Sequence, residues 1–439
     1  MAIRSDGLLF GWGKNLNGAI GDGTTANKSS PVQIGTSSWF QVTTGGSGAG
    51  APSAANTLAI RSDGLLFAWG DNGNGNFGDG TITNKSSPIL IGTSSWTFVT
   101  ASNNYYDNST FGITSTGALF GWGNSDYSRL GNGVPIVTAS ANFSFATKLS
   151  TFLTRVSPIQ VGTSSWTQIS AGQGYSMAIR SDGLLFAWGT NTSGRLGDGT
   201  TITRVSPIQI GTSSWTQISV GKTSNSLAMI SLAIRSDGAL FAWGNNGSGQ
   251  LGDGTIITRS SPVQIGSSSW TQISAGTTST GSPYSMAIRS DGLLFAWGFN
   301  ANGKLGDGTT VDKTSPVQIG SFSWTQVSAG GSHSMAIRSD GLLFGWGGGG
   351  FGALGDGTAV SKSSPVQIGS SSWTQVSASF DAYTMAIDVN GALYGWGKAG
   401  QYVLGDGTLI TKSSPVQIGT SSWTQVSAGY SATAAISVT

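Results

Sequence analysis

Every tryptophan in this chain of 439 residues stands at one of two repeated positions. The first position closes a phrase such as Gly-Leu-Leu-Phe-Ala-Trp-Gly, and the second lies in the phrase Ser-Trp-Thr or Ser-Trp-Phe. Together they hold all 16 tryptophans: Trp12, Trp69, Trp122, Trp188, Trp243, Trp297, Trp346 and Trp396 at the first, and Trp39, Trp96, Trp166, Trp215, Trp270, Trp324, Trp373 and Trp423 at the second. A repeat of about 50–65 residues is typical of stacked β-units, so we expect eight like modules.

Residues 270–319 show the pattern inside one unit. A run of alternating residues begins at Trp270, and a second run covers residues 285–289. The turn Ser290-Asp291-Gly292 then predicts a tight hairpin into the run 293–297. After a loop rich in Gly and Asn, a short run opens with Pro316, a position that strands tolerate. The unit therefore predicts four strands, whose apolar side chains are buried when the units stack radially.

Each end of the chain carries part of a unit. Residues 1–7 begin where other units have Met-Ala-Ile-Arg-Ser-Asp-Gly, and Ala434-Ala435-Ile436 lies at the same place in the last unit. Strands from the two ends can then pair in one blade, which would close the ring and remove free edges. We expect an all-β propeller of eight four-stranded blades, with residues 1–439 as a single domain.

The composition argues against several classes of function. The chain has no Cys and no Glu, a single His, and only 9% charged residues, which leaves no thiolate site and little material for acid–base catalysis. A net charge of +2 without a Lys/Arg run argues against a nucleic-acid surface. No apolar stretch approaches a membrane span, and the start lacks the apolar core of a signal peptide. We expect a protein that is not an enzyme, holds no cofactor or metal, and neither binds nucleic acid nor inserts into a membrane.

The repeated phrases resemble those of the RCC1 (regulator of chromosome condensation) repeat family. The matching phrases are Ser-Asp-Gly-Leu-Leu-Phe-Ala-Trp-Gly, Asn-x-x-Gly-x-Leu-Gly-x-Gly, Pro-Val-x-Ile and Trp-x-x-Val-Ser-Ala-Gly. The resemblance implies a β-propeller, and familiar members have seven blades, which is the alternative to the eight counted here. The family usually has a histidine in its Gly-x-x-His-Ser phrase; only His333 matches it here, and Tyr175, Tyr284 and Tyr383 take that place in other units. The family's second histidine, in the phrase Leu-Gly-His-Gly, is replaced by an aspartate here, as at Asp198, Asp253 and Asp307.

Members of that family include exchange factors for a small GTPase and chromatin-binding proteins. The basic tail and the acidic loops that those activities would need are not visible in this sequence. Fold alone does not decide function, so the resemblance implies the architecture and not these activities.

Several loop motifs have structural interpretations that we favour over chemical ones. The phrase Gly73-x-Gly75-x-x-Gly78 matches a dinucleotide fingerprint, which requires a following helix, but a strand is expected here. One Asp in each Gly-Asp-Gly-Thr phrase is too few oxygen ligands for calcium and suggests a turn that the carboxylate stabilises. Each Arg-Ser-Asp phrase places an acid beside its arginine, so we expect surface pairs. We also expect a structural role for His333.

The loops should alternate between two faces of the disc. The short Ser-Asp-Gly and Gly-Thr-Ser-Ser turns share one face, and all the long insertions fall on the other, at residues 45–56, 102–109, 132–155, 222–231 and 277–283. Variable loops on a rigid scaffold are typical of recognition surfaces, in which aromatic residues are enriched; tolerance of insertions is the alternative. The candidate binding residues on this face are Tyr105, Tyr106, Asp107, Phe143, Phe145, Phe299, Phe351 and Tyr402.

We therefore expect a recognition or surface protein. The surface, poor in charge and rich in Ser, Thr, Asn and Gly, suggests a phage virion component, such as a tail or receptor-binding protein, located at the virion or extracellular surface. Its partners would be a host-surface receptor or glycan and other virion proteins. The alternatives are a cytoplasmic RCC1-type interaction module, with regulation of a GTPase as one role, and a structural coat or filament protein; a homo-oligomer is left open.

Overall fold

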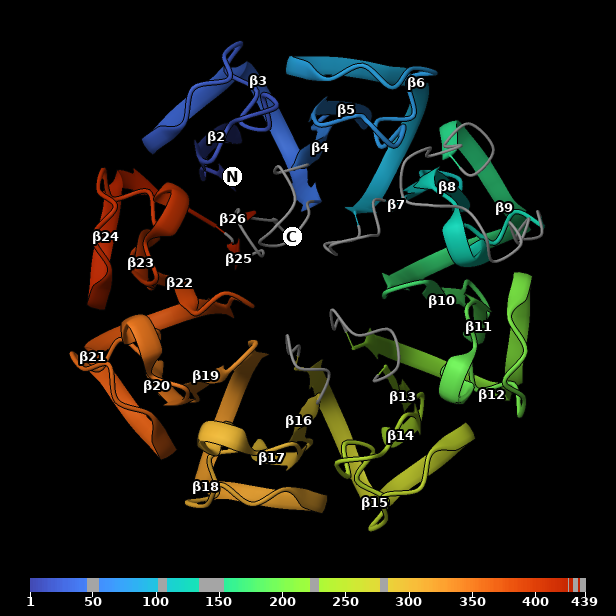
Figure 1. Ribbon diagram of the computed structural model, residues 1–439, viewed down its shortest axis with the longest axis vertical. Helices are drawn as coiled ribbons and strands as arrows, with labels where there is room; N and C mark the ends of the chain where they lie inside the picture. Colours follow the sequence, from blue (N-terminus) through green and yellow to red (C-terminus); the bar gives the residue numbers. More distant parts are fainter. Residues whose placement is uncertain are drawn as a thin grey trace, which may run out of the picture.

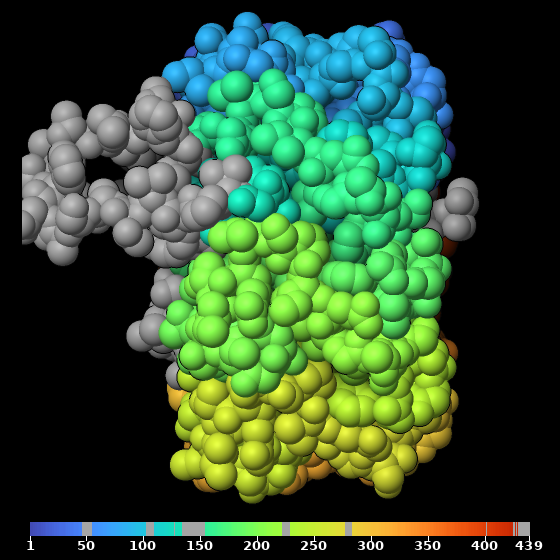
Figure 2. Space-filling model, turned by 90° about the vertical axis from the view of Figure 1, so that its right-hand side faces the viewer, coloured from blue at the N-terminus to red at the C-terminus, as the bar shows by residue number. Residues whose placement is uncertain are grey.

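A computed structural model describes residues 1–45, 55–101, 109–133, 154–221, 229–276, 283–424, 426–428 and 433–434. The fold is all-β, with 61% of the residues in strands and 3% in helices. The strands are arranged around a central axis as a propeller, so the expected fold class is confirmed (Figure 1). The described part of the molecule is a disc seen edge-on in Figure 2.

Two kinds of strand alternate along the chain. Short strands form antiparallel hairpins, joined in most units by the Ser-Asp-Gly turn: β1 (Ala2–Ile3) with β2 (Leu8–Gly13), β4 (Asn56–Arg61) with β5 (Leu65–Gly70), β7 (Ser109–Thr114) with β8 (Ala118–Asn124), β10 (Tyr175–Arg180) with β11 (Leu184–Gly189), β13 (Ile230–Arg235) with β14 (Ala239–Gly244), β16 (Tyr284–Arg289) with β17 (Leu293–Gly298), β19 (His333–Arg338) with β20 (Leu342–Gly347), and β22 (Tyr383–Asp388) with β23 (Ala392–Gly397).

Long strands connect one hairpin to the next: β3 (Lys28–Gly45), β6 (Lys85–Ala101), β9 (Thr154–Ala171), β12 (Arg204–Val220), β15 (Arg259–Ala275), β18 (Lys313–Ala329), β21 (Lys362–Ala378) and β24 (Lys412–Ser422). The first half of β15 pairs with β14 and its second half pairs with β16. The first halves lie at the periphery of the ring and the second halves run towards its centre (Figure 1). Each long strand therefore passes from one blade to the next.

This continuity corrects one expectation from the sequence. The runs at Pro316 and Trp324 were expected to be separate strands with a turn between them, but both belong to β18. Gly320 has a φ of +64° in that stretch, and the pairing with β17 jumps from Gln318 to Ser323. A bulge of this kind bends a strand without ending it, which is why the assignment runs through.

Short 3-10 turns occur in the loops between a hairpin and the next long strand. They are η1 (Asp126–Ser128), η2 (Thr192–Gly194), η3 (Ala301–Gly303), η4 (Gly350–Gly352) and η5 (Gly400–Tyr402). None of the helices in the described part of the chain has the length and apolar composition of a membrane span.

The tryptophans fill the interfaces between blades, as the repeat predicts. Each tryptophan of the Ser-Trp phrase packs at a steep angle against a tryptophan of the Trp-Gly phrase, as Trp215 does edge-on against Trp243 at a centroid distance of 6.3 Å. Both side chains are buried, together with Leu, Ile, Met and Ala residues from two adjacent hairpins. Such T-shaped pairs add to the free energy gained from burying the rings.

A hydrogen bond accompanies each Trp-Gly tryptophan. The indole nitrogen of Trp243 donates to the carbonyl oxygen of Arg195, in the loop of the preceding unit, at 2.9 Å. The same bond joins Trp12 to Val403, Trp69 to Ala19, Trp122 to Asn76, Trp188 to Arg129, Trp297 to Gln250, Trp346 to Lys304 and Trp396 to Ala353. These bonds fix the position of one blade relative to the next.

Glutamine side chains join the inner segments of neighbouring blades. The Gln217 side-chain oxygen accepts a hydrogen bond from the Ile273 N–H at 3.1 Å, and Gln272 accepts one from Val327 at 3.2 Å. The bond recurs at Gln41 with Val99, Gln168 with Ile218, Gln326 with Val376, and Gln375 with Val426. The innermost segment of a blade is a sheet edge, and these amides satisfy N–H groups that would otherwise be unpaired there.

The two ends of the chain meet, but not through the expected ladder of strands. A single bridge joins Arg4 to Trp423, while β25 (Ser427–Ala428) and β26 (Thr433–Ala434) pair only with each other among the described residues. Contacts outside the sheet complete the junction, since the Gly407 N–H donates to the Ser29 carbonyl at 2.8 Å. The count of eight blades, which depends on how these terminal strands pair, stays a prediction.

Candidate functional site

The loops divide between two faces as the sequence predicts, for the residues that the structure describes. The Trp39 N–H donates to the Gly7 carbonyl, so the Gly-Thr-Ser-Ser bend lies beside the Ser-Asp-Gly turn; we call this side the turn face. At the other end of the strands, the Thr190 N–H donates to the Gly174 carbonyl. The loops that follow the inner segments and the Gly/Asn-rich loops therefore share a second side, which we call the insert face.

On the turn face the charges are paired within each unit, as the sequence predicts. The Arg235 guanidinium bonds to the Asp237 carboxylate at 2.6 Å and lies over the Phe241 ring, 4.9 Å from its centroid. The hydrogen bonds from Arg235 lower the pKa of Asp237 to about 2. The arrangement recurs at Arg4, Arg61, Arg180, Arg289 and Arg338. These arginines are already neutralised, so they do not form an anion-binding ring.

An open hollow of about 460 Å³ lies on the turn face between two blades. Its lining includes Gln217, Thr271, Arg289 and Trp324. The only charged group in this lining, Arg289, is bound to Asp291. The hollow therefore presents no free charge to a ligand.

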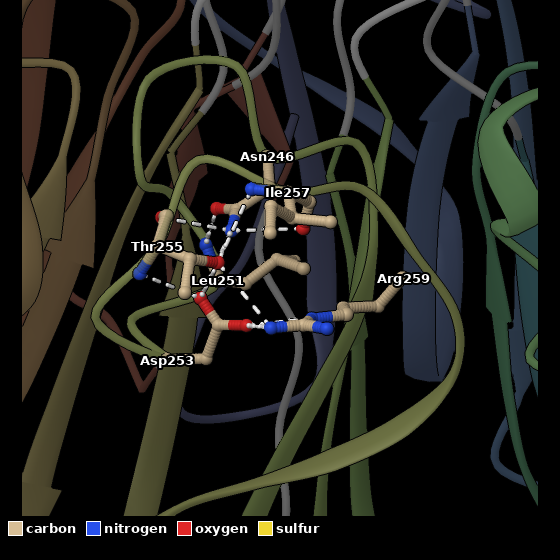
Figure 3. Close-up of polar contacts among 6 residues, drawn as sticks. All are labelled: Asn246, Leu251, Asp253, Thr255, Ile257 and Arg259. Atoms are coloured by element: carbon tan, nitrogen blue, oxygen red, sulfur yellow. Dashed lines mark hydrogen bonds and ion pairs between the residues drawn. The ribbon is translucent and has the colours of Figure 1, made fainter.

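Side-chain hydrogen bonds that recur from unit to unit brace the loops of the insert face, as Figure 3 shows for one unit. The Asn246 amide donates to the Asp253 carboxylate and to the Thr255 carbonyl, and its oxygen accepts from the Leu251 N–H. The Asp253 carboxylate also accepts from the Thr255 N–H and hydroxyl and from Arg259. The side chains thus replace water as partners of the loop backbone.

This bracing explains the aspartate of the Gly-Asp-Gly-Thr phrase. The Asp253 side chain is only 3% exposed. Burial alone would raise the pKa of Asp253, but the hydrogen bonds from Thr255 and Arg259 outweigh burial and lower it. The carboxylate oxygens are occupied by these donors, which supports the structural interpretation over a calcium site. Among the described residues, no three His or Asp side chains gather closely enough to hold a metal ion.

Two neighbouring loops lack the asparagine brace and carry aromatic residues instead. Gly349 and Ala399 stand at the position of Asn246, five residues before the leucine of each loop. In these loops Phe351 and Tyr402 adopt left-handed backbone angles, with φ values of +59° and +60°. Bulky side chains rarely adopt this region, which costs free energy. Phe351 nevertheless points its ring outwards and is 55% exposed.

A cation and an acid lie beside Phe351. The Lys398 ammonium is 5.6 Å from the centroid of the Phe351 ring. It also bonds to both oxygens of the Asp381 carboxylate, at 2.8 and 2.9 Å. Phe351 and Tyr402 are candidates from the sequence, but the sequence gives no signal for Lys398 and Asp381, because these two residues come from different loops and are 17 residues apart. We call Phe351, Lys398 and Asp381, together with the half-buried Tyr402 of the loop that begins at Lys398, the aromatic patch.

Phe299, the third candidate in the described residues, has a different environment. Its ring lies 4.9 Å from the Lys304 ammonium, which also lies 5.1 Å from the centroid of Tyr284. Lys304 is buried and donates to the Gly331 carbonyl at 3.3 Å. Burial lowers the pKa of Lys304 to about 8. Phe299 is thus half-buried and packs on the buried Lys304 ammonium. The other candidate binding residues lie outside the described part of the chain; they are Tyr105, Tyr106, Asp107, Phe143 and Phe145.

His333 is a buried structural residue, as the sequence predicts. One ring nitrogen, Nε2, lies 2.9 Å from the Thr384 hydroxyl, and the side chain is fully buried. Burial, with a smaller contribution from the charge of Lys304, lowers the pKa of His333 to about 4. The tyrosines that stand at the corresponding position of other units are also buried. The Tyr284 hydroxyl, for example, donates a hydrogen bond to the backbone carbonyl oxygen of His333 at 3.0 Å.

Models of one protein family match nearly the whole length of the chain. The family model described as RCC1-like domain matches residues 1–323. Models of the regulator of chromosome condensation (RCC1) repeat match residues 324–353, 340–387 and 390–436.

Individual relatives and solved structures agree with that match. The chain is 27% identical over 268 residues to the ultraviolet-B receptor UVR8 of Arabidopsis thaliana, which covers 60% of this chain and 55% of UVR8. Human WBSCR16 superposes with a TM-score of 0.62 at 18% identity, over 84% of this chain and 98% of that protein. Prp20p of Saccharomyces cerevisiae, characterised for its binding to Gsp1p and histones, gives 0.58 at 20% identity over 86% and 90%. This chain spans about half the length of UVR8. The similarities to WBSCR16 and to Prp20p show the fold.

Proposed function

Because the chain belongs to the RCC1-like domain family, we propose that it is a non-enzymatic interaction module that binds a protein partner through the aromatic patch of its insert face. The similar proteins support this choice of class: Prp20p binds Gsp1p and histones. They favour the alternative drawn from the sequence, an RCC1-type interaction module, over a phage virion component, for which they give no support.

The single observation that carries the proposal is the backbone strain at an exposed aromatic residue. Phe351 adopts a φ of +59° and remains 55% exposed. The corresponding position of another loop is Asn302, with a φ of +63°, and Asn tolerates this region far better than Phe does. A large apolar side chain that is strained and yet faces solvent contributes little to the fold, and such strain is concentrated at functional sites.

The chemistry of the patch indicates what kind of surface would fit it. The Phe351 and Tyr402 side chains offer apolar and aromatic contact, and the Lys398–Asp381 pair lies beside Phe351. Both charged side chains are about one-third exposed, at 36% and 35%, so each can accept a further partner at the rim of a contact. Aromatic residues surrounded by a polar rim are typical of protein interfaces. A partner that presents an apolar side chain next to a polar or charged group is therefore the best fit.

Site-specific photo-crosslinking tests the proposal. A photoreactive phenylalanine analogue is placed at position 351 in the full chain, and in a second variant at position 389. Val389 is a matched control because it is 58% exposed and lies in the turn that follows β22, on the turn face. In the cells that produce the chain, we expect a protein adduct from position 351 and not from position 389.

Competition makes the test specific for the patch. Excess unlabelled wild-type chain should abolish the adduct, whereas the double variant Phe351→Asn/Tyr402→Gly should not. The absence of an adduct at position 351, the same adduct from position 389, an adduct made only of two copies of this chain, or equal competition by the double variant would each overturn the proposal.

A further inference from the structure

The hollow on the turn face is lined by residues from three neighbouring blades. Its volume is about 460 Å³, which lies within the range of small-molecule sites in proteins. The lining residues belong to the inner segments of β12, β15 and β18 and to the hairpin of β16 and β17. These elements follow one another around the ring in Figure 1. The hollow is therefore a site between blades, separate from the aromatic patch in place and in lining.

Two glutamine side chains bring amide donors to this lining. The side-chain oxygens of Gln217 and Gln272 each accept a backbone N–H from the inner segment of the next blade. Both side chains are partly exposed, and in the described part of the chain neither side-chain nitrogen has a hydrogen-bond acceptor. The corresponding nitrogen of Gln41 is bonded instead to the Val99 carbonyl. The fold thus orients the amides of Gln217 and Gln272 and leaves their donors for a ligand.

Hydroxyl groups and a small apolar base complete the hollow. Thr271 and Ser290 are both exposed in the lining. The Thr271 hydroxyl donates to the Ile288 carbonyl at 3.3 Å, so its oxygen is left to accept a hydrogen bond. Ile288 and Trp324 also line the hollow although each is only 3% exposed. These two apolar side chains therefore contact the hollow at its base.

The lining disfavours a charged ligand. Its only charged residue, Arg289, bonds to Asp291 and lies over the Phe295 ring, 5.1 Å from its centroid. A carboxylate or phosphate ligand is bound most strongly by a free cation, above all by an arginine fork. The hollow lacks such a cation, and its amide and hydroxyl groups suit a neutral ligand that carries several hydroxyl groups.

We propose that the hollow binds a neutral saccharide. A sugar hydroxyl both donates and accepts, so it can pair with the amide donors of Gln217 and Gln272 and with the hydroxyl of Thr271. The apolar C–H face of a sugar ring fits the base formed by Ile288 and Trp324. This inference goes beyond the proposed function, which places a protein partner on the insert face, and it does not depend on the aromatic patch.

An array of neutral, sialylated and sulfated glycans, probed with the labelled full chain, tests the inference. We expect binding to neutral glycans, and isothermal titration with the neutral oligosaccharide that binds best then gives the association constant. The variant Gln217→Glu/Gln272→Glu keeps the side-chain oxygens that accept the backbone N–H groups but removes the amide donors. It should lower the association constant by roughly tenfold or more, because two hydrogen bonds to the ligand are lost.

Two further variants control for added charge and for folding. Gln264→Glu/Gln318→Glu places the same charges at exposed glutamines outside the lining and should leave the association constant unchanged. Ser290→Tyr fills the hollow from an exposed turn position whose side chain has no hydrogen bond in the described part of the chain. We expect it to abolish binding at an unchanged melting temperature.

Four outcomes would overturn the inference. They are no binding to any neutral glycan, binding to acidic glycans alone, unchanged affinity in Ser290→Tyr or in a folded Gln217→Glu/Gln272→Glu variant, and an equal loss of affinity in the Gln264→Glu/Gln318→Glu control. The crosslinking test at position 351 is read out separately, so failure of either proposal is distinguishable.

Discussion

The indole nitrogen of Trp12 donates a hydrogen bond to the carbonyl oxygen of Val403 at 3.1 Å, across a sequence separation of 391 residues. Both residues are buried, and Gly405 lies against the same indole ring. The bond is the same one that joins Trp243 to Arg195 between adjacent units in the middle of the chain. The junction of the two ends therefore uses the ordinary contact between blades, although a single bridge rather than a ladder joins their sheets.

Substitution of Trp12 tests whether this junction contributes as much as the others. The variants Trp12→Phe and Trp243→Phe each lose a similar ring area and one indole hydrogen bond, which contributes about 0.5–1.5 kcal/mol. In Trp243→Phe the Arg195 carbonyl keeps a second donor, the Ser231 hydroxyl at 2.8 Å. We expect Trp12→Phe to lower the free energy of unfolding in urea by at least as much as Trp243→Phe does. A much smaller effect for Trp12→Phe would show that the ends separate in solution.

The two classes of tryptophan should differ in their tolerance of phenylalanine. The Trp346 indole donates to the Lys304 carbonyl at 2.9 Å, whereas the buried Trp324 indole nitrogen has no hydrogen-bond acceptor. Trp324→Phe removes an unpaired donor, but Trp346→Phe breaks a bond. We expect Trp346→Phe to be the more destabilising by about 1 kcal/mol or more in urea unfolding. Equal losses from the two variants would contradict this explanation.

The regular parts of the fold could be predicted because the same sequence pattern recurs in each unit. Ser290-Asp291-Gly292 forms the predicted hairpin turn, and Trp270 and Trp297 are buried against each other at 6.2 Å. The bend of β18 could not be predicted, because Gly320 between two apolar runs is equally consistent with a turn and with a bulge. Only the pairing of the strand with two hairpins decides between them.

The candidate site was harder to predict because it depends on departures from the repeat. The phenylalanine at position 351 could be identified as an aromatic on the insert face, but its left-handed backbone could not. The contact of Lys398 with Asp381 joins two different loops, and neither residue has a counterpart in the repeated phrases.

Relief of backbone strain should stabilise the protein at the aromatic patch. Phe351→Asn copies Asn302, and Tyr402→Gly copies the glycine found at the same place in other loops, such as Gly303. Each should raise the free energy of unfolding by about 1 kcal/mol, because the left-handed region penalises bulky side chains. Urea unfolding measures the gain.

The reverse substitution controls for effects unrelated to the backbone. Asn302→Phe places a bulky residue at a φ of +63° and should be destabilising. If Phe351→Asn left stability unchanged or lowered it, packing of the Phe351 ring on Lys398 would outweigh the strain, and the argument that this aromatic residue contributes little to the fold would fail.

Acid should destabilise the protein through His333. The pKa of this histidine is lowered from 6.5 to about 4 in the folded chain, so between these pH values the unfolded chain binds a proton that the folded chain does not. Stability from this group is complete above pH 6.5 and falls as the pH drops towards 4, by up to roughly 3 kcal/mol.

The variant His333→Tyr copies Tyr175 and Tyr383, which are buried at the same position, and does not titrate in this range. Urea unfolding of both proteins at a series of pH values between 7 and 4 isolates the contribution of His333, because the aspartates are common to both. We expect the wild type to lose stability relative to the variant over this window, and parallel curves would show that His333 is protonated in the folded protein without cost.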